Sequence, residues 1–244
     1  MDKTDFFDKY RTPLLIGIGT VLLIIISIII LFNQRTFENT RVSGSDYIFG
    51  IDVSHYQGRI NWSKVKRSKH PIKFVFIRST MGTDGIDSQF KRNWKHSKKQ
   101  GFIRGAYHYY RPNENSTKQF NLFASAVKLE RGDFPPILDI ERQSVYGNDN
   151  LIKGIKNWLD LAEKKYGIKP VIYTGRKFYN THLKGHFNDY PLWIASYSAK
   201  HKLNGISWTF HQFSKSLRIK GISHYVDGND FDGNLDQLKN MCIK

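Results

Sequence analysis

The chain has 244 residues, of which 40% are hydrophobic and 14% aromatic, so it has enough apolar material for a packed core in one or two domains. Its net charge of +17 favours an anionic partner, such as an acidic cell-wall polymer or an anionic lipid, although a lysine-rich solvated surface is the simpler explanation. Nucleic acid is not expected, because the basic residues are scattered and no zinc-ligand spacing or RNA-binding aromatic motif accompanies them. A single cysteine, Cys242, excludes an internal disulfide, and no cysteine cluster or paired histidine spacing indicates a metal or another cofactor.

Residues 14–32 form an apolar run without a charged residue. A helix of this length crosses the roughly 30 Å hydrocarbon core of a bilayer, and no face of this segment is polar. A cleavable signal peptide is the alternative, but its apolar region is usually about 7–15 residues long and a small-residue cleavage site should follow it. We therefore expect a short cytoplasmic segment at residues 1–13, a transmembrane anchor at 14–32 and a polar linker at 33–46. The basic residues on either side of the run give a weak bias that places the following domain, residues 47–244, on the extracytoplasmic side.

Strand and helix patterns alternate from residue 47 onward, which is typical of an α/β fold. Strands are expected over residues 48–53, 73–78, 103–109, 136–141, 170–174, 191–196, 207–213 and 224–227. Helical periodicity predicts helices over residues 86–99, 116–131, 150–166 and 176–183. Ser116-x-x-Gln119 resembles a capping box, Gly167 would close the third helix, and the helical pattern stops after residue 185. Eight strands with about five helices predict an irregular TIM-like barrel whose final third lacks its outer helical layer.

Polar and aromatic residues stand at or near the end of every expected strand, where an α/β barrel carries its active site. They are Asp52, Arg78, Tyr107, Tyr109, Asp139, Glu141, Tyr173, Trp193, Gln212 and Asp227. Asp139 and Glu141 are one residue apart in an apolar segment, so they face the same side of a strand. Two like charges on one face of a buried strand are costly unless a function uses them, and hydrolysis of a glycosidic bond uses paired carboxylates. Their spacing fits both the retaining and the inverting geometry.

Several of these residues also have a purely structural interpretation. An isolated Asp-x-Glu is more often a solvated strand end, and Trp193 fits the core as well as it fits a substrate contact. Arg78 at a barrel rim is able to pair with a site carboxylate instead of touching substrate. His55 and His108 are better explained as hydrogen-bonded structural histidines than as metal ligands, because no second histidine stands at ligand spacing.

Six segments carry a resemblance to a known family. They are Gly50-Ile51-Asp52-Val53-Ser54-His55-Tyr56-Gln57-Gly58, Gly105-Ala106-Tyr107-His108-Tyr109, Leu138-Asp139-Ile140-Glu141, Leu192-Trp193-Ile194-Ala195, Trp208 with His211-Gln212-Phe213-Ser214, and Val226-Asp227-Gly228-Asn229-Asp230-Phe231-Asp232-Gly233. In this order they resemble glycoside hydrolase family 25, the Chalaropsis-type lysozymes, over about residues 48–240. One departure is the segment Ser79-Thr80-Met81-Gly82, where members of that family often carry an acidic residue.

The resemblance implies a muramidase that cuts the β-1,4 bond between N-acetylmuramic acid and N-acetylglucosamine in peptidoglycan glycan strands. It further implies that Glu141 is the general acid, that Asp139 stabilises the developing positive charge or orients the acetamido group of the substrate, and that Asp52 and Asp227 complete the acidic site. The remaining site residues would bind substrate, with stacking faces for the sugar rings: Tyr107, Tyr109, Tyr173 and Trp193, together with Gln212 and Arg78. A non-catalytic glycan-binding protein on the same scaffold is the alternative, and it is disfavoured because a binding module does not need four carboxylates at one point. A metal-dependent deacetylase is disfavoured because its histidine pair is missing.

Overall fold

The computed structural model describes residues 13, 15–32, 47–198, 203 and 205–244, and the chain divides into two compact units, Met1–Gly44 and Ser45–Lys244. In the first unit, Leu15–Phe32 form one apolar helix with a mean hydropathy of 3.1. The hydroxyls of Thr20 and Ser27 each donate, at 2.8 Å, to the carbonyl oxygen four residues earlier, so both are satisfied within the helix. The expected linker, and the expected cytoplasmic segment apart from Pro13, lie outside the described residues.

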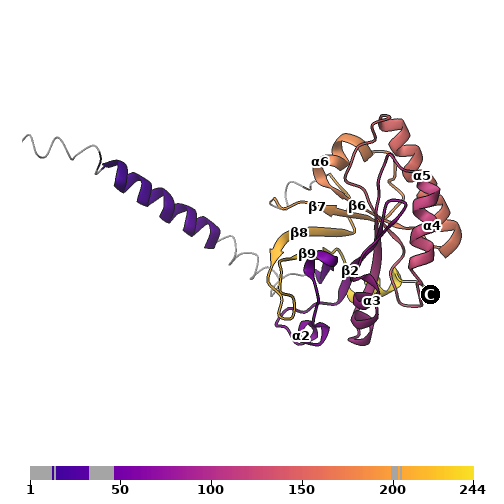
Figure 1. Cartoon of the computed structure of the whole chain (residues 1–244), viewed down its shortest axis with the longest axis horizontal. Helices are drawn as coiled ribbons and strands as arrows, with labels where there is room; N and C mark the ends of the chain where they lie inside the picture. Colours follow the sequence, from indigo (N-terminus) through magenta and orange to yellow (C-terminus); the bar gives the residue numbers. More distant parts are fainter. Residues whose placement is uncertain (1–12, 14, 33–46, 199–202, 204) are drawn as a thin grey trace, which may run out of the picture. The chain divides into compact units, whose positions relative to one another are not determined.

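The second unit is a barrel (Figure 1). Its eight strands among the described residues are β1 (Ile48–Val53), β2 (Phe74–Met81), β4 (Ile103–Tyr109), β5 (Ile137–Asp139), β6 (Val171–Gly175), β7 (Leu192–Ala195), β8 (Phe210–Leu217) and β9 (Val226–Phe231). Each pairs with the next, and β1 pairs with both β2 and β9, which closes the ring. The first seven of these barrel strands run parallel, whereas β9 is antiparallel to both of its neighbours. The irregular TIM-like barrel predicted from the sequence is confirmed.

Helices cover the outside of the barrel (Figure 1). They are the 3-10 turn η1 (His55–Gln57), α2 (Trp62–Lys66), α3 (Phe90–Lys99), α4 (Ser116–Ala126), α5 (Asn148–Tyr166), α6 (Arg176–Phe178), the π turn η2 (Tyr179–Leu183) and α7 (Leu235–Asn240). The longest, α5, forms as expected, because its apolar stripe is fully buried and Gly167 ends it in the left-handed conformation, with φ of 67°. Helices α4 and α5 pack against each other.

Four details of the helical prediction are wrong. Helix α4 ends at Ala126, five residues before the predicted end at residue 131. Residues 85–86 form the short strand β3 (Gly85–Ile86), which folds back on β2, so α3 begins only at Phe90. Asn115, not Ser116, caps α4, because its side chain accepts from the backbone N–H of Lys118 at 2.9 Å. Helix α7 forms after residue 185, where no further helix was expected.

Aromatic rings fill the barrel beneath the rim. Phe74 and Phe76 point inward from β2 and belong to a buried aromatic cluster inside the ring. Glycines on the flanking strands make room for them: a Cβ atom at Gly50 would lie 2.4 Å from the ring of Phe74, and one at Gly105 would lie 2.8 Å from that of Phe76. The next inward position on β2 is Arg78. The inward side of β2 therefore has apolar residues that pack inside the barrel and a polar residue, Arg78, that reaches the rim.

Candidate active site

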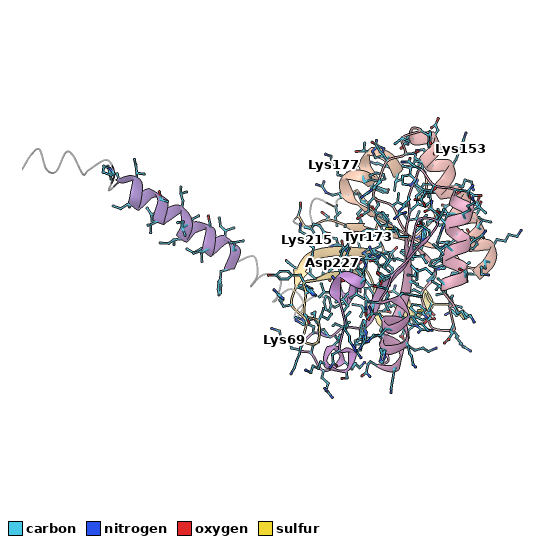
Figure 2. All side chains as sticks on the ribbon, in the orientation of Figure 1. Lys69, Lys153, Tyr173, Lys177, Lys215 and Asp227 are labelled. Atoms are coloured by element: carbon cyan, nitrogen blue, oxygen red, sulfur yellow. The ribbon has the colours of Figure 1, made fainter. Side chains whose placement is uncertain are left out.

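A cleft of ≈ 560 Å³ opens at the end of the barrel where the parallel strands finish. Every barrel strand, or the segment directly after it, contributes to its wall. All ten residues expected at the site line the cleft: Asp52, Arg78, Tyr107, Tyr109, Asp139, Glu141, Tyr173, Trp193, Gln212 and Asp227. Figure 2 labels three residues of this wall, Tyr173, Asp227 and Lys215, in the central part of the domain. Polar strand ends that are far apart along the chain thus meet in one place.

Asp227 reaches the rim by a route that the sequence did not indicate. It was expected at the end of a strand over residues 224–227, but it is the second residue of β9. Because β9 is antiparallel to its neighbours, its beginning shares the rim with the ends of the parallel strands. The register of β1 and β9 sets Asp227 directly opposite Asp52.

Asp52 and Asp227 form a carboxyl pair whose side chains share a hydrogen bond. Burial is the main cause that raises the pKa of both groups, to about 6 for Asp52 and about 8 for Asp227. The charge of Asp52 raises the pKa of Asp227 further, whereas amide hydrogen bonds oppose the increase at Asp52. Since two like charges in such contact cannot both ionise without a large cost, the pair holds one proton between them at neutral pH.

Two side-chain amides fix the position of Asp52. Its Oδ2 accepts N–H bonds from Gln212 at 2.8 Å and from Asn229 at 2.9 Å. The indole Nε1 of Trp193 donates in turn to Asn229 Oδ1 at 2.8 Å. The sequence analysis did not single out Asn229, although it stands two residues after Asp227 and the alternation of a strand places it on the same face.

Two tyrosine hydroxyls orient the side-chain amide of Gln212. Tyr173 and Tyr197 donate to Gln212 Oε1 at 2.9 and 2.7 Å, which leaves the amide nitrogen of Gln212 directed at Asp52. Tyr197 was not expected at the site, because it follows β7 in a segment without a strand or helix signal. This relay holds one oxygen of Asp52 with neutral donors, which fixes the position of its carboxyl group in the cleft wall.

Asp139 and Glu141 lie on the same wall in different environments. The strand expected over residues 136–141 is shorter in the structure: β5 ends at Asp139, and Glu141 lies in the segment that follows it. Asp139 is buried, and its Oδ1 has no hydrogen-bond partner among the described residues. Burial, followed by the charges of Glu141 and Asp52, raises the pKa of Asp139 well above its ordinary value. Glu141 is open to solvent, yet the cleft walls displace part of the water around its carboxyl group, and this desolvation raises its pKa as well. The charge of Arg142 and the Tyr173 hydroxyl oppose that increase.

Most of the aromatic residues expected to stack on sugars are too buried to do so. Only 1% of Trp193 is exposed, and its indole packs in the barrel core. Tyr107 and Tyr173 are also buried, so the stacking role expected for these three residues is wrong, although their edges line the cleft. The aromatic residues that do expose surface at the cleft are half-buried Tyr109 and two that the sequence analysis did not select: Tyr56, 69% exposed, and Tyr197, 50% exposed.

Arg78 lines the cleft but is held by other protein groups. Its Nε donates to Asp87 Oδ2 at 3.0 Å, its guanidinium contacts His55 Nδ1, and it lies 5.1 Å from the centre of the Tyr56 ring. The alternative that Arg78 pairs with a site carboxylate is therefore wrong about the partner, because Arg78 pairs with Asp87 and not with one of the four expected acids. Met81 also lines the cleft, at the segment where an acidic residue is absent.

A cleft with two carboxylates on one strand end, and a proton-sharing carboxyl pair opposite them, is the arrangement of a hydrolase that cleaves glycosidic bonds on an α/β barrel. Comparison with known proteins agrees. A family model for glycosyl hydrolases family 25 matches residues 51–222, and the chain belongs to this family. The protein is therefore a glycoside hydrolase.

Individual relatives extend this result. YegX of Escherichia coli (strain K12) is 40% identical over 203 residues, which cover 82% of this chain and 75% of YegX. Lysozyme M1 of Streptomyces globisporus is 35% identical over 225 residues, covering 84% of this chain and 74% of the relative. Among solved structures, the bacterial lysozyme of Streptomyces coelicolor is 32% identical with a TM-score of 0.73, covering 82% of this chain and 98% of that structure.

Proposed function

We propose that the protein is a peptidoglycan muramidase that hydrolyses the β-1,4 bond between N-acetylmuramic acid and N-acetylglucosamine. The observation that carries the proposal is the pairing of a solvent-open carboxyl, Glu141, with a buried and unpartnered one, Asp139, on one wall of the cleft. Similarity to proteins named as lysozymes supports peptidoglycan as the substrate.

Glu141 acts as the general acid in this mechanism. It is accessible to a bound glycan, and its raised pKa favours the protonated form that must donate to the leaving oxygen. Asp139 is largely buried, but it lines the cleft, so the part of its carboxyl group that faces the cleft can accept the N–H of a substrate acetamido group. That contact would orient the acetamido oxygen toward the anomeric carbon, so that no protein nucleophile is required.

Substrate binding also decides which carboxyl holds the proton. In the free protein, burial favours a protonated Asp139. An N–H donated by the substrate stabilises the ionised form of Asp139, and the resulting negative charge favours protonation of the neighbouring Glu141. Binding of an N-acetylated sugar would therefore increase the fraction of Glu141 that carries the proton.

Glu141→Gln tests the assignment of the acid. The substitution keeps the size and polarity of the side chain but removes its transferable proton, so release of reducing muramic-acid ends from purified peptidoglycan should fall by about 10²–10⁴-fold. Glu163→Gln on α5, outside the cleft lining, is the matched control and should retain wild-type activity. Full activity of Glu141→Gln would remove Glu141 as the acid. A wild-type protein that binds peptidoglycan without cutting it would favour the non-catalytic alternative.

We also propose that Leu15–Phe32 anchor the protein in a membrane with the hydrolase domain on the extracytoplasmic side. The helix is long and apolar enough to cross a bilayer, and its two hydroxyls are satisfied internally. The full chain should stay in the membrane fraction after alkaline carbonate extraction and keep its N-terminal residues by mass spectrometry. Release of a protein that begins after residue 32 would instead identify a cleaved signal peptide.

A further inference from the structure

A second groove, of ≈ 840 Å³, runs along α3 on the outside of the barrel. Trp94 contributes apolar surface to it and packs on the buried ring of Phe90, with ring centres 5.4 Å apart, and Ile86 beside them is 62% exposed. Five exposed lysines line the same groove: Lys91, Lys95, Lys98, Lys99 and Lys128. This surface is called the lysine groove below. The hydrolytic mechanism uses none of its lysines.

The positive charge of the lysine groove is not neutralised within the protein. Lys91, Lys95 and Lys99 recur every four residues on α3, a spacing at which like charges repel one another and destabilise a helix. No residue of α3 is acidic, and none of these three lysines forms an ion pair within the described part of the chain. A bound anion would relieve this repulsion.

The two acidic residues that line the groove already have partners. Asp87 is buried and accepts from Arg78, and Glu130 pairs with Lys98. His96, also on α3, is affected by the same positive charge. Burial is the first cause that lowers its pKa, and the adjacent cations lower it further. An anionic ligand would therefore meet several free cations and no competing free carboxylate on the described walls.

Shared lining residues place the lysine groove close to the active-site cleft. A small cavity of ≈ 160 Å³ lies between them. It shares Arg78 and Met81 with the cleft, and it shares Ile86 and Asp87 with the lysine groove. Met81 is neutral, and the charge of Asp87 is matched by Arg78. A branch of a polymer lying in the cleft therefore has a path along the surface to the lysines.

We propose that the lysine groove binds the carboxylate-bearing peptide stems of a peptidoglycan strand whose sugar backbone lies in the cleft. This inference rests on the proposed muramidase function and names which part of the substrate the protein holds outside the reacting centre. The lysines match the carboxylates of the peptide, and the apolar surface of Ile86 and Trp94 suits its aliphatic side chains. A groove close to the cleft favours a branch of the substrate over a flat anionic membrane surface, which would not enter it.

The combined substitution Lys91→Gln, Lys95→Gln and Lys99→Gln in the full-length protein tests the proposal. Glutamine keeps helix propensity and removes the charge. On peptide-bearing peptidoglycan, kcat/KM should fall about tenfold, equivalent to about 1.4 kcal/mol, mainly through KM. On glycan strands stripped of their peptides by an amidase, the variant and the wild type should be equal. Raising the salt concentration should slow the wild type on the first substrate more than on the second.

A second triple variant controls for the change in net charge. Lys153→Gln, Lys164→Gln and Lys177→Gln remove three exposed lysines that do not line the cleft or the lysine groove. Lys153 and Lys177 are labelled at the upper end of the domain in Figure 2, whereas α3 lies in the lower part in Figure 1. This variant should match the wild type on both substrates.

Co-sedimentation with insoluble peptidoglycan, measured in the Glu141→Gln background, separates the failure of this inference from that of the proposed function. A wild type that cuts neither substrate, with sedimentation still lost in the α3 variant, would refute the muramidase proposal alone. Equal activity and equal sedimentation of the α3 variant and the wild type would refute the lysine groove alone. An equal loss of activity of the α3 variant on both substrates would also refute the lysine-groove proposal. If the α3 variant lost only its binding to anionic lipid vesicles, the groove would instead be a membrane-binding surface.

Discussion

Asp227→Asn tests whether the carboxyls facing each other across β1 and β9 share one proton. Both have a pKa above the ordinary value of 3.8, about 6 for Asp52 and about 8 for Asp227, so the folded state binds more protons than the unfolded state between these limits. Stability must then fall as pH rises from about 4 to about 8. The loss of stability caused by ionising Asp52 and Asp227 is absent below their unfolded pKa of 3.8 and complete above the folded pKa of about 8. Asparagine keeps the shape of Asp227, removes one charge and is able to donate an N–H to Asp52.

The expected magnitude follows from the shift of Asp227. One pKa unit corresponds to about 1.4 kcal/mol, so a shift from 3.8 to about 8 represents on the order of 5 kcal/mol at full ionisation. This is an upper bound, because Asp227 is only partly buried and water screens part of the repulsion. We expect Asp227→Asn to be more stable than the wild type by about 2 kcal/mol or more at pH 9 and by nearly nothing at pH 4.

Urea unfolding of the Ser45–Lys244 unit, followed by circular dichroism from pH 4 to pH 9, measures this difference. Asp160→Asn on α5 is the matched control, because that carboxylate is exposed and paired only with Lys156; its effect should stay within about 0.5 kcal/mol at every pH. If the unfolding free energies of Asp227→Asn and the wild type ran parallel across the pH range, the shared-proton description of the pair would be refuted.

Two further predictions concern the acid and the scaffold. Tyr173→Phe removes a hydroxyl that lowers the pKa of Glu141, so the alkaline limb of the kcat–pH profile should move to higher pH. Gln212 keeps its hydrogen bond from Tyr197 in this variant. An unchanged alkaline limb would contradict the effect of the Tyr173 hydroxyl on Glu141. Asp133→Asn leaves Arg104 buried without the carboxylate that it contacts at 2.7 Å, and the unfolding free energy should drop by about 3–5 kcal/mol in the same urea assay. A loss below about 1 kcal/mol would show that Arg104 finds another partner or reaches water.

The α5 and β2 segments show how far local sequence determines the fold. The apolar stripe of α5 and its closing Gly167 are local signals, and both appear in the structure as the sequence predicts. The alternation on β2 likewise separates the inward rings of Phe74 and Phe76 from the aliphatic Val75 and Ile77 on the other face. By contrast, residues 86–89 fit a helical pattern but enter a hairpin and a turn, because Gly85 and Ile86 pair with β2 and a carboxylate oxygen of Asp87 accepts the backbone N–H of Gln89 at 2.9 Å.

The sequence by itself determined which polar residues stand at strand ends, since the period of two along a strand is local and survives any tertiary arrangement. It did not determine the direction of β9, because reversing a strand leaves the same residues facing inward. Only the pairing of β1 with β9 brought Asp227 opposite Asp52 and joined their titrations. Burial was decided in the same way: Trp193 and Tyr56 are both aromatic in the sequence, but the packing of the ring enclosed the first and left the second open to the cleft. Proton sharing and solvent exposure depend on neighbours across the barrel, and those neighbours exist only once the chain has closed on itself.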